Sequence, residues 1–86
     1  MAKMFSENAQ RIIRFLQDNP NVDLTAKELA SAIGITSRSA NGCITGLTRK
    51  GLAQRISIRG EAGVEYKVVR LTDMGRQVDP DADKRA

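Results

Sequence analysis

The spacing of apolar residues predicts a helix near the start of the chain. Four apolar residues recur at i, i+3, i+4 and i+7 and so share one helical face: Ala9, Ile12, Ile13 and Leu16. Ser6 precedes them as a candidate N-cap, and the Asn19-Pro20 step is a stop signal. Apolar and polar residues then alternate over residues 22–24, which is enough for a minor strand.

Two more helices are expected after this strand. Thr25 and Glu28 have the spacing of a capping box, in which the hydroxyl and the carboxylate each accept a hydrogen bond from the other residue's backbone N–H. The helix that they start is short, because Gly34 is suited to the left-handed conformation that ends helices. A third helix is expected over about 37–50, with Thr36 as its N-cap.

After the third helix the period changes from helical to alternating, which predicts a β-hairpin over residues 52–70. The expected register places apolar residues opposite one another: Ile58 with Val64, and Ile56 with Tyr66. This register leaves a short glycine-containing loop around residues 60–62. Arg55 and Arg59 alternate with the isoleucines, and we expect them on the outward face of the hairpin.

The order of these elements predicts an α+β winged helix-turn-helix, with a three-helix core and a C-terminal β-hairpin wing. The 86 residues are too few for two independent cores, so we expect one domain over residues 1–76. Thr72 is a candidate cap for a further turn or two of helix. Residues 77–86 are expected to form a charged, disordered tail.

The distribution of charge points to a polyanionic partner. The formal net charge is +4, and no acidic residue lies between Glu28 and Glu61. That interval holds five basic residues: Arg38, Arg49, Lys50, Arg55 and Arg59. A purely cationic stretch of this length favours binding to a phosphate backbone, although scattered basic residues also occur on ordinary solvated surfaces.

Composition argues against several other classes of protein. There is no histidine, and Cys43 is the single cysteine, so we expect no internal disulfide, no zinc site, no other metal and no cofactor. General acid–base catalysis usually needs histidine or paired carboxylates, so we do not expect an enzyme. No apolar run approaches the roughly 20 residues of a membrane span, and no secretory signal is recognisable, so a cytoplasmic location is expected.

The third predicted helix has one apolar side and one side suited to DNA. Its expected core-facing residues are Ala40, Cys43, Ile44 and Leu47. The opposite side and its flank hold Arg38, Asn41, Gly42, Thr45 and Arg49. Arginine can bind guanine with two hydrogen bonds, asparagine can do the same with adenine, and threonine is adaptable. We therefore expect this helix to lie in the major groove.

Several further residues complete the predicted interface. Thr36, Ser37 and Ser39 lie where hydroxyls and free backbone N–H groups suit a phosphate, although capping alone would also explain them. Gly42 would permit close approach of the backbone to DNA, or else close packing against the first helix. Arg59 lies beside the hairpin turn and can reach a minor groove or its phosphates. The predicted DNA-contacting residues are Thr36, Ser37, Arg38, Ser39, Asn41, Gly42, Thr45, Arg49, Lys50, Arg55 and Arg59.

From Leu24 to Arg76 the chain resembles the winged-helix transcriptional regulators of the MarR type. The segments that carry the resemblance are "LTAKELASAIGITSRSANGCITGLTRKGLAQRISIRG" and "YKVVRLTDMGR". Within them, "RKGLAQR" marks the step from helix to wing, and "LTDMGR" resembles the leucine-threonine-x-x-glycine turn that follows the wing. The resemblance implies a DNA-binding regulator with residues 37–49 in the major groove and Arg59 on the wing.

The chain also departs from this family's pattern. Full-length members carry long terminal helices that form a dimer and shelter a ligand pocket, whereas this sequence shows a short first helix and a ten-residue charged tail. The middle of its third helix also contains fewer arginine and lysine residues than the same helix of many family members. The resemblance therefore does not carry over effector binding or obligate dimerisation, and a homodimer stays an open alternative.

Sequence-specific binding of double-stranded DNA in transcription control is thus the leading hypothesis. The alternative is a winged-helix module for protein–protein interaction, in which the basic face meets an acidic surface. RNA binding by base stacking is disfavoured, because Phe5, Phe15 and Tyr66 are the only aromatic residues.

Overall fold

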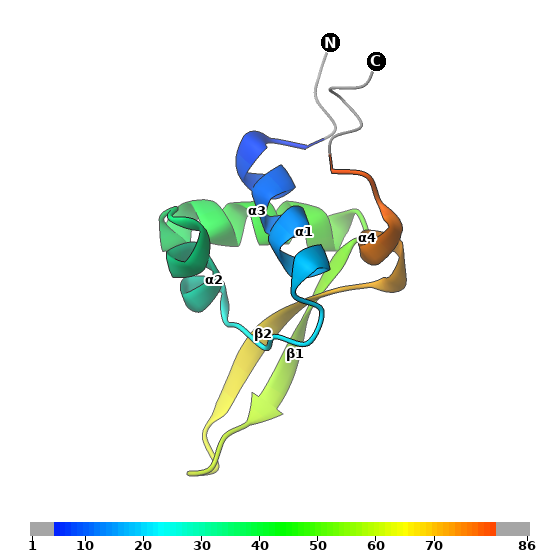
Figure 1. Cartoon of the computed structure of the whole chain (residues 1–86). Coiled ribbons are helices and arrows are strands. Elements are labelled where there is room, and N and C mark those ends of the chain that lie inside the picture. The colour runs from blue at the N-terminus through cyan, green and yellow to red at the C-terminus, as the bar shows by residue number, and fades with distance from the viewer. Residues whose placement is uncertain (1–4, 81–86) are drawn as a thin grey trace.

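The computed structural model describes residues 5–80, which fold into a helical body with a projecting hairpin (Figure 1). The elements are α1 (Glu7–Asp18), α2 (Ala26–Ile33), α3 (Ser37–Arg49), β1 (Ala53–Arg59), β2 (Glu65–Leu71) and α4 (Asp73–Gln77). Three helices followed by a two-stranded antiparallel sheet confirm the predicted α+β architecture. The minor strand expected at residues 22–24 is present as a single bridge between Leu24 and Val69.

The helices begin and end where their capping residues lie. Four hydroxyl side chains each accept a hydrogen bond from a backbone N–H in the first turn of the following helix: Ser6, Thr25, Thr36 and Thr72. The capping box at α2 is complete, because the Glu28 carboxylate also accepts a bond from the Thr25 backbone. Gly34 ends α2 with φ of 76°, a conformation that glycine adopts without steric cost. These local predictions are confirmed.

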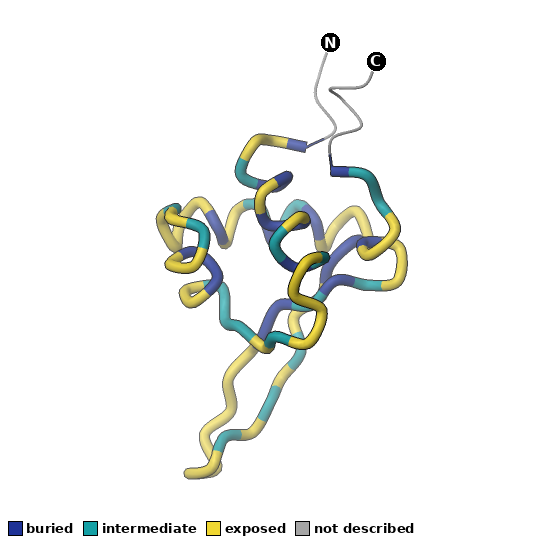
Figure 2. Tube along the Cα trace, viewed as in Figure 1, coloured by how far each residue is buried: buried dark blue, intermediate teal, exposed yellow. Residues whose placement is uncertain are grey.

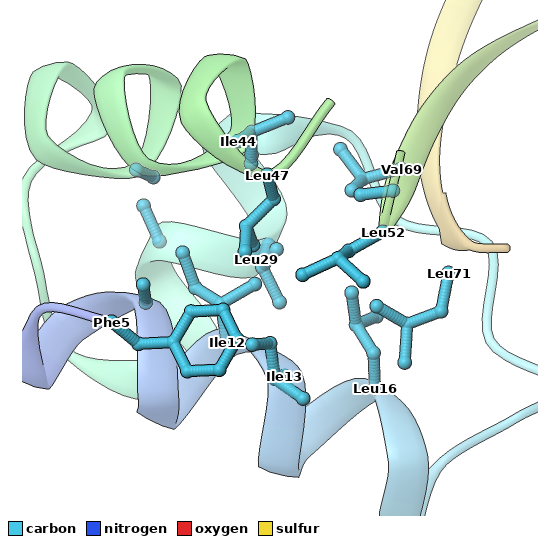
Figure 3. Close-up of a cluster of buried hydrophobic side chains, with 14 residues drawn as sticks. Phe5, Ile12, Ile13, Leu16, Leu29, Ile44, Leu47, Leu52, Val69 and Leu71 are labelled. Atoms are coloured by element: carbon cyan, nitrogen blue, oxygen red, sulfur yellow. The ribbon is translucent and has the colours of Figure 1, made fainter. Parts of the chain in front are cut away.

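One apolar core lies between the first three helices and the base of the hairpin (Figure 3). Its fully buried residues include Ile12, Ile13, Leu29 and Ile44, each with 0% of its surface exposed. Burying a side chain of this size contributes about 1.5–3 kcal/mol each. Val69 and Leu71 of β2 and Leu52 before β1 join the same core, so the hairpin is anchored at its base. Its outer part is mostly exposed (Figure 2).

The register of the hairpin differs from the predicted one by two residues. Ile58 pairs with Tyr66 and Ile56 pairs with Val68, and the loop spans residues 60–64. The predicted register matched apolar residues near the tip, where Val64 is 66% exposed and gains little from pairing. The observed register buries β2 residues at the base instead, and burial at the base stabilises more than a side-by-side contact in solvent.

The register also shows which side chains share a sheet face with the hairpin arginines. Residues directly opposite each other in an antiparallel pair share one face of the sheet. Arg55 pairs with Val69, which is buried in the core, so Arg55 and Arg59 lie on the face that is continuous with the core-facing side. Both arginines are nevertheless exposed, as their alternation with the isoleucines predicted. The half-buried Ile56 and Ile58 occupy the other face.

The chain returns to the helical body through α4. The Thr72 hydroxyl donates to the Gly51 carbonyl at 2.6 Å, and the Thr72 backbone N–H donates to the Leu52 carbonyl at 3.0 Å. Gln17 of α1 donates to the carbonyls of Gly75 at 3.1 Å and Val78 at 2.8 Å. Most of the tail expected at 77–86 lies outside the described residues, and Val78 packs against the core.

Candidate nucleic-acid interface

Helix α3 presents the two sides that its sequence predicts. Ala40, Ile44 and Leu47 are buried, and Cys43 is half-buried against the core, so the apolar stripe faces inward. Arg38 and Arg49 are exposed on the opposite side. No hydrogen bond or ion pair within residues 5–80 engages either guanidinium. Both charges are therefore available to an external anion.

The start of α3 is capped by the residue expected there. The Thr36 hydroxyl accepts a hydrogen bond from the Ser39 backbone N–H at 3.1 Å, so its acceptor is used inside the protein. Ser37 and Ser39 are exposed, and the first turn of the helix contains no acidic residue. A phosphate could approach this end without meeting a negative charge.

Gly42 and Gly46 are not explained by packing inside the protein. A Cβ atom added at either position would meet no atom within 4 Å, which rules out close packing against α1 as their reason. Gly42 is exposed and Gly46 is half-buried, and both line an open groove beside Phe5 at the start of α1. The space over Gly42 is open to an external molecule.

Lys50 lies on the flank of α3 that faces α1. Its Nζ atom is 5.1 Å from the centre of the Phe5 ring, within the range of a cation–π interaction. Phe5 is 2% exposed, so the ring is a fixed partner. This contact holds the Lys50 ammonium on the α1 side of the helix, away from the hairpin.

The opposite flank of α3 faces the hairpin, and the structure brings two of the predicted residues together there. Arg55 of β1 donates from Nη2 to Oδ1 of Asn41 at 3.4 Å. Near the tip, Arg59 lies 3.8 Å from the carboxylate of its cross-strand partner Glu65, with 74% and 66% of the two side chains exposed. An exposed pair of this kind is weak, so Arg59 can exchange Glu65 for another anion at little cost.

Comparison with known proteins gives matches among solved structures alone. No protein-family model matches the chain, and no curated protein sequence does. MepR, a transcription regulator of the Staphylococcus aureus multidrug efflux pump MepA, matches with a TM-score of 0.72 at 22% identity, over 86% of this chain and 52% of that chain. A MepR–DNA complex matches with a TM-score of 0.68 at 21% identity, over 83% and 49% of the two chains.

A possible transcriptional regulator from Methanosarcina mazei Go1 matches with a TM-score of 0.69 at 10% identity, over 80% of this chain and 57% of that chain. This chain therefore spans about half the length of the proteins that it matches. Its fold is that of a MarR-type winged helix-turn-helix domain. In this domain α2 and α3 form the helix-turn-helix, and β1 with β2 forms the wing.

One basic residue of the winged-helix domain was missed by the sequence argument. Lys67 is exposed and lies opposite Ser57, on the same hairpin face as Arg55 and Arg59. The predicted register, although two residues out, already placed Lys67 on this face, opposite Arg55, because a shift of two residues leaves each side chain on the same face. With the observed register, the face that continues from α3 along the wing carries three basic residues.

The described part of the chain offers neither a cluster of metal ligands nor a membrane-spanning helix. Within residues 5–80 there is no group of three or more aspartate, glutamate, cysteine or histidine residues placed to hold a metal ion. None of the helices in this part of the chain has the length and apolar character needed to cross a membrane.

Proposed function

We propose that this domain binds double-stranded DNA sequence-specifically, as a transcriptional regulator or as the DNA-binding part of one. In the proposed complex α3 enters the major groove, and the wing follows the adjacent backbone or minor groove. The single observation that carries the proposal is the exposed side of α3, where Arg38 and Arg49 have no partner among residues 5–80. Each can form two hydrogen bonds to guanine.

The shape of the domain supports the same arrangement. A helix with its side chains is about 10–12 Å across, and the major groove is about 12 Å wide. The apolar stripe of α3 is buried, so the helix can enter a groove without exposing core residues. The wing carries Arg55, Lys67 and Arg59 along one face. A solved complex of MepR with DNA, whose fold this chain shares, supports the proposal by analogy.

The proposal is tested by selecting duplexes from a random pool and measuring their affinity for single-residue variants. Arg49→Ala should cost about 1–3 kcal/mol and relax the preference at one base position, because a base contact is lost. Arg59→Ala should weaken binding to all duplexes to a similar extent, because it removes a backbone contact.

Arg14→Ala provides a control with the same loss of charge. Arg14 lies on α1, which packs against the buried side of α3, and its replacement should leave both affinity and base preference unchanged. If Arg49→Ala and Arg59→Ala bind like the parent, the proposed face is wrong. If the parent binds no duplex even at low salt, the domain is a protein-interaction module instead.

A further inference from the structure

The side-chain amide of Asn41 is occupied at both ends within the protein. Its Nδ2 donates to the Ser37 carbonyl at 3.0 Å, one helical turn back, and its Oδ1 accepts from Arg55 Nη2 at 3.4 Å. The sequence alone suggested that Asn41 contacts adenine. An adenine contact uses the amide oxygen and one N–H side by side against one base edge, whereas the two existing hydrogen bonds already fix the orientation of this amide toward Ser37 and Arg55.

Arg55 is the wing residue next to this amide. Its cross-strand partner Val69 is 1% exposed, so Arg55 stands where the hairpin emerges from the core. No acidic side chain among residues 5–80 forms an ion pair with Arg55. A guanidinium has five N–H donors, and one hydrogen bond to a neutral amide leaves its charge and most donors for another acceptor.

We infer that Asn41 is a positioning residue, which holds the Arg55 guanidinium at the junction of α3 and the wing so that it meets a backbone phosphate. This inference rests on the proposed binding of DNA. Phosphate contacts set the register of a protein on the duplex without reading its sequence. A neutral asparagine suits the role, because an acidic residue at this place would neutralise the arginine and repel the phosphate.

A double-mutant cycle tests the coupling on a duplex selected by the parent protein. Asn41→Ala should weaken binding by about three- to tenfold, the value of one hydrogen bond that orders a charged group, and should do so equally on all duplexes. Arg55→Ala should weaken binding. It should also reduce the slope of log affinity against log salt concentration by about one, the value of one phosphate contact. The double variant should bind like Arg55→Ala alone, because Asn41 acts through Arg55.

Thr45→Ala is the matched control on α3, since no hydrogen bond within residues 5–80 joins Thr45 to Arg55. The loss of binding free energy caused by Thr45→Ala should add to the loss caused by Arg55→Ala. Asn41 and Arg55 are exposed, so thermal unfolding of all variants should match the parent and separate positioning from folding. The inference is overturned if Asn41→Ala has no effect, relaxes the preference at one base pair, or adds fully to Arg55→Ala. Failure of the parent to bind any duplex would instead reject the proposed function.

Discussion

At the scale of single residues, two glycines that look alike in the sequence differ in whether the fold requires glycine at their positions. Gly75 is buried, and a Cβ atom there would overlap the carbonyl oxygen of Leu52. Gly46 lies inside α3, and a Cβ atom there would meet nothing within 4 Å. The glycine of the "LTDMGR" turn is therefore required by the close approach of α4 to the segment before β1. The glycine of α3 has no such requirement.

Replacing these two glycines by alanine should change stability in opposite directions. Gly75→Ala should lower the free energy of unfolding by about 1–3 kcal/mol or more, because the backbone of Leu52 must move. Gly46→Ala should raise it by roughly 1 kcal/mol, because glycine is a poor helix former. Urea denaturation of both variants measures the difference. Equal midpoints would mean that α4 does not pack against Leu52 as described.

At the scale of elements, α4 shows how a short helix is held by its neighbours. Its five residues cannot be stable alone, since isolated helices shorter than about 12–15 residues are marginal in water. Thr72 joins it to the body twice: its hydroxyl donates to the Gly51 carbonyl and accepts from the Gly75 N–H at 3.1 Å. The cap of α4 and the connection to the end of α3 therefore share one side chain.

Two substitutions at Thr72 separate this hydroxyl from the shape of the side chain. Thr72→Val keeps the shape but loses both hydrogen bonds, and should lower the free energy of unfolding by about 1–3 kcal/mol. Thr72→Ser keeps the hydroxyl and should remain within about 0.5 kcal/mol of the parent. Thermal or urea unfolding measures both. A valine variant as stable as the parent would show that the hydroxyl contributes nothing, and an equally unstable serine variant would show that the methyl group contributes as much.

At the scale of the whole molecule, exposed basic residues lie on α3 and on one face of the wing, two parts that are distant in the sequence. They are Arg38 and Arg49 on α3, and Arg55, Lys67 and Arg59 on the wing. The link between the two parts is the contact of Arg55 with Asn41. Lys50, which the sequence also predicts to contact DNA, lies on the other flank of α3 with its ammonium over the Phe5 ring.

This arrangement predicts how duplex binding depends on salt. If the three cations of the wing contact phosphates, the logarithm of the affinity should fall with the logarithm of the salt concentration with a slope of about −3. Lys67→Ala should reduce the slope by about one, whereas Arg14→Ala should leave it unchanged. Fluorescence anisotropy between low and moderate salt gives the slope. A slope near zero for the parent would be incompatible with a phosphate-binding surface.

The local features of this fold were predictable because their causes lie within a few residues. The caps at Thr25, Thr36 and Thr72 depend on a hydroxyl and a backbone N–H three residues away. The buried stripe of α3 follows from the helical period alone. Sequence and charge therefore determined the order of elements and the side of α3 that stays exposed.

The tertiary structure decided what depends on contacts between distant segments. The hairpin register followed from burial of Val69 and Leu71 in a core built mainly by the helices, which outweighed apolar pairing near Val64. Packing of the hairpin base against the helices also brought Arg55 to Asn41, two residues on different elements. No pattern within one element contains this information, because the free energy that selects the register is gained only when the wing packs against the helices.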